Sequence, residues 1–156
     1  MKIRILAVGT RMPAWVNDAF EIYARRMPRE CRVELQEIQT GHRARSADVA
    51  KAKATEGDRM LAALSRSKRV IALDVGGKMY DTPGLSRSLD AWAHDGRDIA
   101  LLVGGPDGLA ASCLERAESR WSLSPLTLPH GLVRVVLAEQ IYRAWSLLRG
   151  HPYHRA

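Results

Sequence analysis

The sequence predicts an α/β fold in which a mostly parallel sheet is flanked by helices. Short apolar runs typical of strands alternate with longer segments of helical spacing. The run from Ile99 to Val103 is apolar throughout, as a strand covered on both faces would be. The chain has 156 residues, 46% of them hydrophobic and 26% charged, without a composition break that would mark a linker. We therefore expect a single domain over residues 1–156.

Five strands are expected, each followed by a helix. The first runs from Ile3 to Val8 and ends at Gly9. The others lie at 33–38, 69–74, 99–103 and 121–123, and helical spacing predicts helices at 13–27, 46–64, 82–94, 109–117 and 132–149. Ser46 is a candidate cap of the second helix, and Pro83 suits the first turn of the third. The chain then ends in a tail from His151 to Ala156.

No apolar run approaches the roughly 20 residues that cross a membrane. The first apolar run is also too short for a signal peptide, so we expect a cytoplasmic protein. Cys31 and Cys113 lie far apart and lack the spacing of metal ligands. In a reducing cytoplasm both are expected to be buried, small hydrophobic residues.

The formal net charge of +7 favours a partner rich in phosphate. Charge alone leaves two interpretations open, a nucleic-acid-binding protein and a soluble protein that is merely basic. Candidates for phosphate contacts are Arg25, Arg26, Arg29, His42, Arg43 and Arg45.

Two loops could hold a ligand at the carboxyl ends of the strands, where parallel sheets collect ligands. Gly104-Gly105-Pro106-Asp107-Gly108 follows the clearest strand, and its glycines permit close approach of a ligand to the backbone. It matches neither the dinucleotide fingerprint nor the phosphate loop, and an ordinary tight turn explains it equally well. The loop Leu123–His130 is unusually apolar. It either packs under the core or lines a pocket suited to an adenine ring.

The last helix is apolar on more than one side, which predicts a central helix or one shared with a partner chain. We favour a homodimer interface. Its charged residues Arg134, Glu139 and Arg143 either find partners when buried or form a salt-bridged surface. The tail after it gathers histidine, tyrosine and arginine, which supply donors, a titratable base and a stacking ring suited to a flipped RNA base.

In this order the features resemble the ribosomal RNA large-subunit methyltransferase H family of the SPOUT superfamily. The resemblance covers essentially the whole chain and is most specific in its last third. The residues that carry it are Ala7-Val-Gly-Thr10, Leu73-Asp74, Leu102-Val-Gly-Gly-Pro-Asp-Gly108, Ser122-Leu-Ser124, Thr127-Leu-Pro-His130, Arg134, Glu139-Gln-Ile-Tyr-Arg-Ala144 and His151-Pro-Tyr-His-Arg155.

The resemblance implies a SPOUT-type fold with a deep C-terminal trefoil knot, a feature that general topology rules would not propose. It implies a homodimer in which the tail of one subunit completes the site of the other. The implied reaction is methylation of N3 of a pseudouridine in helix 69 of 23S rRNA, on assembled ribosomes. The implied contacts of S-adenosylmethionine are Leu73, Gly104, Gly105, Leu123, Ser124, Pro125, Leu126, Thr127 and Leu128.

Such a reaction must remove the proton from N3 and stabilise the anion that spreads onto the two neighbouring carbonyls. We expect His154 to be the base, with Tyr153 as the next candidate. Arg155 and Arg134 are candidate donors to the carbonyls, and His130 could orient the cofactor loop. The sulfonium supplies its own leaving group, so no metal is expected.

Three other interpretations remain at this stage. A non-catalytic ribosome-binding factor shares the basic charge but does not need the glycine turn, the apolar loop and the tail together. A nucleotide-dependent oxidoreductase would normally carry the dinucleotide fingerprint. A SPOUT enzyme with another RNA target, such as transfer RNA, is a third alternative, although the chain leaves little room for an added RNA-binding domain.

Overall fold

The computed structural model describes residues 1–65 and 68–155 and contains a five-stranded, fully parallel sheet. The strands, in the spatial order β2-β1-β4-β3-β5, confirm the predicted α/β class. Their bounds are β1 (Lys2–Val8), β2 (Arg32–Ile38), β3 (Arg69–Met79), β4 (Ile99–Val103) and β5 (Ser119–Ser122). The helices are α1 (Ala14–Ala24), α2 (Val49–Ala62), α3 (Thr82–Asp95), α4 (Ala111–Arg116) and α5 (His130–Leu148), with 3₁₀ turns η1 (Ser46–Asp48) and η2 (Pro152–His154).

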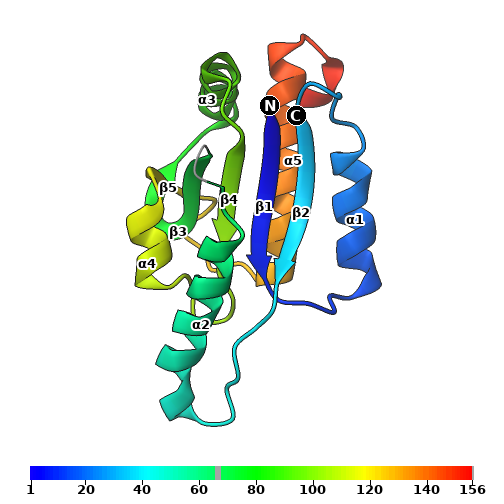
Figure 1. Cartoon of the computed structure of the whole chain (residues 1–156). Helices are drawn as coiled ribbons and strands as arrows, with labels where there is room; N and C mark the ends of the chain where they lie inside the picture. The colour runs from blue at the N-terminus through cyan, green and yellow to red at the C-terminus, as the bar shows by residue number, and fades with distance from the viewer. Residues whose placement is uncertain (66–67, 156) are drawn as a thin grey trace.

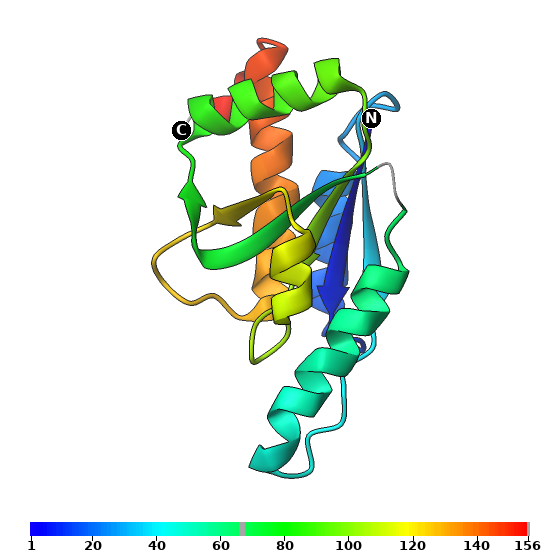
Figure 2. The same cartoon turned by 60° about the vertical axis from the view of Figure 1, so that its left-hand side comes forward.

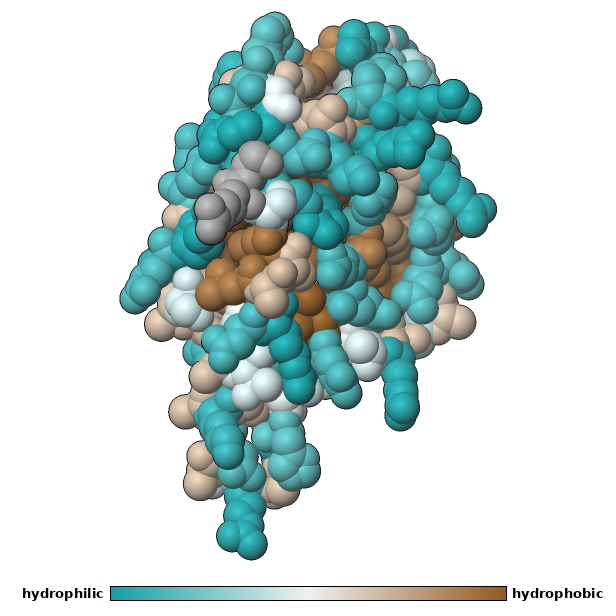
Figure 3. All heavy atoms as spheres, viewed as in Figure 1, coloured by the Kyte–Doolittle hydropathy of each residue, from teal (hydrophilic) through white to brown (hydrophobic). Residues whose placement is uncertain are grey.

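Helices cover both faces of the sheet (Figure 1). Helices α1, α3 and α5 pack around one core, while α2 and α4 pack around the other. Side chains of β1 belong to both cores: Ile3 and Ile5 lie in the core with α5, whereas Leu6 and Val8 lie in the core with α2 and α4. Polar side chains cover most of the face seen in Figure 3, with apolar side chains gathered near its middle. Because helices cover both faces of the sheet, the side chains of its central strands are buried on both sides, and those strands are therefore continuous apolar runs in the sequence.

Strand β3 is longer than predicted. The sequence places its end at Asp74, whereas the strand continues to Met79, with an irregular register against β5 between Leu73 and Lys78. Gly76-Gly77 hides this extension in the sequence, because glycine is unusual inside a strand. At Gly77 a β-carbon would lie 2.6 Å from the backbone of Arg120, so glycine is what allows β5 to approach.

Several helix ends also differ from the prediction. Ser46 does not cap α2: the chain first makes the turn η1, and the Asp48 carboxylate accepts a hydrogen bond from the backbone of Arg45 at 3.2 Å. Helix α3 begins at Thr82 as predicted, and the Asp81 side chain caps it by accepting from the backbone of Gly84 at 2.7 Å. Helix α5 begins at His130, two residues before the predicted start.

Both cysteines are buried, as predicted, and burial raises the pKa of the Cys31 thiol to about 11. Within residues 1–65 and 68–155, no helix is at once long enough and apolar enough to cross a membrane. The tail does not trail away from the body: η2 folds back against α5, at the end of α5 opposite to the carboxyl ends of β1 and β4 (Figure 1).

Candidate active site

A cavity of about 480 Å³ opens beyond the carboxyl end of β4 and beside the middle of β3, at the edge of the sheet where the sequence predicts a ligand. Three segments enclose it: the middle of β3 around Asp74, the glycine turn after β4, and the loop that leads from β5 into α5. Its lining residues are Leu73, Asp74, Val75, Val103, Gly104, Gly105, Pro106, Gly108, Ser122, Leu123, Ser124, Leu126, Thr127, Leu128, Pro129, His130 and Val133.

The glycine turn is closed on itself. The backbone N–H of Gly108 donates to the carbonyl of Gly105 at 3.1 Å. A β-carbon on Gly104 would lie 2.7 Å from both the carbonyl oxygen of Gly108 and the nitrogen of Leu109. Gly108 has a φ of +80°, a conformation that glycine adopts at little cost. The turn can therefore hold its backbone at the cavity wall only with glycine at these positions.

The loop between β5 and α5 is ordered by serine hydroxyls. Ser122 Oγ donates to the carbonyl of Ser124 at 3.1 Å, and Ser124 Oγ accepts from the backbone of Leu126 at 2.9 Å. The Leu126 side chain is 73% exposed although it is large and apolar. The loop thus presents leucine side chains to the cavity and keeps backbone polar groups nearby, a combination suited to a planar heterocycle.

The structure brings together most of the residues predicted to contact a cofactor. Leu73, Gly104, Gly105, Leu123, Ser124, Leu126, Thr127 and Leu128 all line the cavity, whereas Pro125 is exposed and outside the lining. Their contact with a cofactor stays a prediction. Asp74, which the sequence marked only as part of the resemblance pair Leu73-Asp74, also lines the cavity. Val133 was not predicted as a lining residue, because it lies in the helix that follows the predicted loop.

The predicted catalytic tail does not reach this cavity within one chain. Tyr153, His154 and Arg155 are absent from its lining, and η2 packs against the far half of α5. The cavity touches His130 and Val133 in the first turn of that helix, while Tyr153 contacts Glu139, about 14 Å further along the axis than His130. Figure 2 shows, from another side, the C-terminal turn and the start of α5 at opposite ends of that helix.

Glu139 holds the tail in place. Its Oε1 accepts from Arg143 Nη2 at 2.6 Å and from the Tyr153 hydroxyl at 3.0 Å. The Tyr153 ring also packs on Tyr142, with ring centroids 4.6 Å apart. Burial, and then the hydrogen bond to Glu139, raise the pKa of Tyr153 well above its ordinary value. Among the described residues, the half-buried His154 has no hydrogen-bond partner for its Nδ1.

Arg134 is fully buried and bonds to the ends of two strands. Its Nη1 donates to Glu37 Oε2 at 2.8 Å, and its Nη2 donates to the carbonyl of Gly9 at 2.7 Å. Gly9 has a φ of +117°, which turns that carbonyl toward the guanidinium. In this arrangement Arg134 fixes the first turns of α5 to β1 and β2. A direct role for Arg134 as a donor to substrate carbonyls stays a prediction that this burial does not favour.

Replacing Arg134 by alanine is expected to lower the free energy of unfolding by about 2–4 kcal/mol, because the buried carbonyls of Val8 and Gly9 lose their donor and the removal of a fully buried side chain leaves a cavity. Urea denaturation measures the change. The control is Arg120→Ala, an arginine that is half exposed and 3.8 Å from Asp74, where about 0–1 kcal/mol is expected. Equal small losses in both variants would contradict the structural role of Arg134.

The residues predicted to contact phosphate fall into two groups. Arg25, Arg29, His42 and Arg45 are exposed, and His42 and Arg45 lie in the segment that leads into α2, which projects from the body (Figure 1). Arg43 instead bonds to Glu56 and Asp107, which does not favour a phosphate contact, and its predicted phosphate-binding role stays a prediction. Arg26, although exposed, lies over the rings of Tyr23, Tyr142 and Tyr153.

Comparisons with known proteins agree with this geometry. Residues 1–154 match the family described as "Predicted SPOUT methyltransferase". A probable methylase family protein from Haemophilus influenzae has a similar fold, with a TM-score of 0.57 and 11% identity over 99% of this chain and 70% of that one. The fold and the match over nearly the whole length define the class: the chain belongs to the SPOUT methyltransferase family.

Closer relatives carry a more particular name. A protein of Alkalilimnicola ehrlichii, 61% identical over the full length of both chains, is named ribosomal RNA large subunit methyltransferase H. A protein of Thioalkalivibrio sulfidiphilus with the same name is 59% identical over 99% of each chain.

Proposed function

We propose that the chain, folded as one domain over residues 1–156, is an S-adenosylmethionine-dependent methyltransferase of ribosomal RNA. Its proposed target is N3 of a pseudouridine in helix 69 of 23S rRNA, within assembled ribosomes of the cytoplasm. The observation that carries the proposal is the cavity at the carboxyl end of β4. Its walls are the glycine turn and the leucine-rich loop between β5 and α5, in a chain of the SPOUT methyltransferase family. The names of the full-length relatives support ribosomal RNA as the substrate.

The cavity suits the adenosyl group of this cofactor. Leucine side chains of the loop from β5 to α5 offer apolar surface for the adenine ring, and loop backbone groups can bond to its edge. The glycine turn brings bare backbone to the opposite wall, and a β-carbon at Gly104 would clash with the backbone of Gly108 and Leu109 and force the turn to shift. When bound, the cofactor supplies a methyl group on a sulfonium, which is a good leaving group.

The substrate half of the site must come from elsewhere, since the tail of the same chain lies about 14 Å or more along α5 from the cavity. A homodimer solves this problem if the tail of one subunit lies over the cavity of the other. In such a site His154 is placed to take the N3 proton, and Arg155 to bond to the neighbouring carbonyls as charge develops. Alignment of N3 with the methyl group would supply much of the rate.

The same proposal includes a trefoil knot. The loop from β5 to α5, the glycine turn and the first turn of α5 all line the same cavity, and α5 is the helix that a knotted chain would pass through an earlier loop. A knot would hold these segments together around the cofactor without a disulfide or a metal.

Replacing Tyr153 by phenylalanine is expected to leave the shape of the pH–rate profile unchanged between about pH 6 and 9. The pKa of the phenol is raised, so Tyr153 stays protonated over this range and cannot be the group whose loss of a proton activates the enzyme. In the same assay His154→Gln is expected to remove the rise in rate with pH. Loss of that rise in Tyr153→Phe instead would make Tyr153 the base.

Calorimetry with S-adenosylmethionine tests the cofactor directly. Binding at micromolar concentration is expected for the wild type, whereas nicotinamide and flavin nucleotides should not bind. No binding below about 1 mM cofactor would favour a non-catalytic ribosome-binding factor. Methylation of transfer RNA but not ribosomes would favour a SPOUT enzyme with another target.

A further inference from the structure

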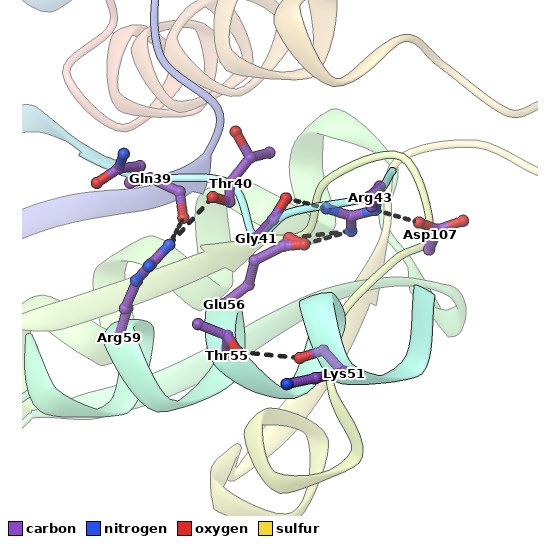
Figure 4. A network of polar contacts seen from close by, with 9 residues as sticks. All are labelled: Gln39, Thr40, Gly41, Arg43, Lys51, Thr55, Glu56, Arg59 and Asp107. Carbon is purple, nitrogen blue, oxygen red and sulfur yellow. Dashed lines mark hydrogen bonds and ion pairs between the residues drawn. The ribbon is translucent and has the colours of Figure 1, made fainter. Parts of the chain in front are cut away.

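Arg43 links the segment between β2 and α2 to the glycine turn after β4. It lies in the segment between β2 and α2, and its Nε donates to Asp107 Oδ2 at 2.7 Å. Its Nη2 donates to both carboxylate oxygens of Glu56, at 3.1 Å to Oε2, and its Nη1 donates to the carbonyl of Gly41 at 3.3 Å. Figure 4 shows the guanidinium between Glu56 of α2 and Asp107 of the glycine turn.

Asp107 belongs to the turn that forms one wall of the cavity, but it does not line the cavity itself. Gly104, Gly105, Pro106 and Gly108 are lining residues, whereas the Asp107 carboxylate bonds to Arg43. The turn therefore faces the cavity with its backbone, and on its outer side the Asp107 carboxylate attaches it to Arg43. Internally only the bridge between Gly105 and Gly108 closes it.

On the other side of Arg43, several contacts fix its guanidinium and its backbone to α2. Glu56 is 4% exposed on α2, so its charge needs the Arg43 guanidinium. The segment that carries Arg43 is pressed onto the same helix, because a β-carbon on Gly41 would lie 2.6 Å from the α-carbon of Ala52. Arg59 of α2 fixes the preceding residues by donating to the carbonyls of Gln39 and Thr40. The hydrogen bonds that Arg43 donates to the Glu56 and Asp107 carboxylates also raise its pKa, which keeps it charged.

We propose that Arg43 and Asp107 are positioning residues for the cofactor: together they hold the glycine turn at the distance from the leucine-rich loop that S-adenosylmethionine requires. The inference rests on the proposed function, because it assumes that the cofactor binds in this cavity. Arg43 then acts on cofactor affinity through Asp107 and the turn backbone, and it makes no contact with RNA phosphate. The pair is the link by which α2 supports the cavity wall.

The test uses Asp107→Ala, which removes the ion pair to the turn but leaves Glu56 bonded to Arg43. We expect the KM for S-adenosylmethionine and its Kd by calorimetry to rise about fivefold, with kcat at saturating cofactor and the KM for ribosomes unchanged. Asp107→Glu should restore most of the affinity. Asp58→Ala is the matched control, because Asp58 is an exposed carboxylate of α2 that makes no ion pair among the described residues.

A second variant, Arg43→Lys, keeps a positive charge beside Glu56 but cannot reach both carboxylates with the same geometry. It should weaken cofactor binding to the same degree, and the double variant Arg43→Lys/Asp107→Ala should be no weaker than either single variant. Unchanged cofactor affinity in Asp107→Ala, or an equal loss in Asp58→Ala, would overturn the inference. A wild-type protein that binds no S-adenosylmethionine would instead refute the proposed function.

Discussion

Replacement of Gly104 by alanine is expected to weaken S-adenosylmethionine binding at least about 30-fold, or about 2 kcal/mol. The added β-carbon would lie 2.7 Å from the carbonyl oxygen of Gly108 and from the nitrogen of Leu109. Both atoms are backbone, so no side chain can rotate away, and the turn itself must shift. Because the turn forms a wall of the cavity, the shift changes the space that the cofactor occupies.

Calorimetry of Gly104→Ala measures this loss, and circular dichroism shows whether the variant is still folded. Gly131→Ala is the matched control, because its β-carbon would meet only side chains, Met12 Sδ at 3.3 Å and Val16 Cγ2 at 3.5 Å, which can move. A folded Gly104→Ala protein with wild-type affinity would place the cofactor away from the glycine turn.

Removing the functional groups of the tail, with His154→Ala and Arg155→Ala together, is expected to lower kcat at least about 100-fold while cofactor affinity is kept. The base and a donor to the developing anion are then missing, but the cavity is intact because neither residue lines it. Methyl transfer to ribosomes at saturating cofactor measures kcat, and calorimetry measures cofactor affinity.

Mixing this tail variant with Gly104→Ala distinguishes a site shared between subunits from one within a chain. At a cofactor concentration well below the wild-type Kd, where each variant alone is nearly inactive, subunit exchange should make half of the dimers mixed, and each mixed dimer has one intact cavity beside one intact tail. About a quarter of wild-type activity should return. Activity that stays at the level of the separate variants would contradict the composite site.

The outline of the fold could be predicted because each central strand is buried on both faces and therefore apolar. The second half of β3 was not predicted, because Gly76-Gly77 resembles a turn rather than a strand. The strand continues there because β5 packs closely against Gly77. The start of α5 at His130 was hidden in the same way, since Pro129 and Gly131 resemble loop residues.

The cavity could be predicted because two segments with unusual composition, the glycine turn and the leucine-rich loop, form its walls. The side-chain pairings that join distant segments of the chain could not be predicted. Arg43 resembled a free basic residue until the fold placed Glu56 and Asp107 beside it. Likewise the sequence predicted Arg134 as a donor to the substrate, whereas in the fold its guanidinium donates to Glu37 and to the carbonyl of Gly9. Such pairings depend on tertiary packing rather than on local sequence.

Methyl transfer from labelled S-adenosylmethionine, compared on assembled ribosomes, isolated subunits and free ribosomal RNA, tests the proposed activity most directly. The modified nucleotide is then mapped by mass spectrometry of RNA fragments. We expect label on assembled ribosomes, at N3 of a single pseudouridine in helix 69, and much less of it with Gly104→Ala at a cofactor concentration well below the wild-type Kd. Label at another nucleotide, or none on any ribosomal substrate with a protein that binds the cofactor, would contradict the proposed reaction.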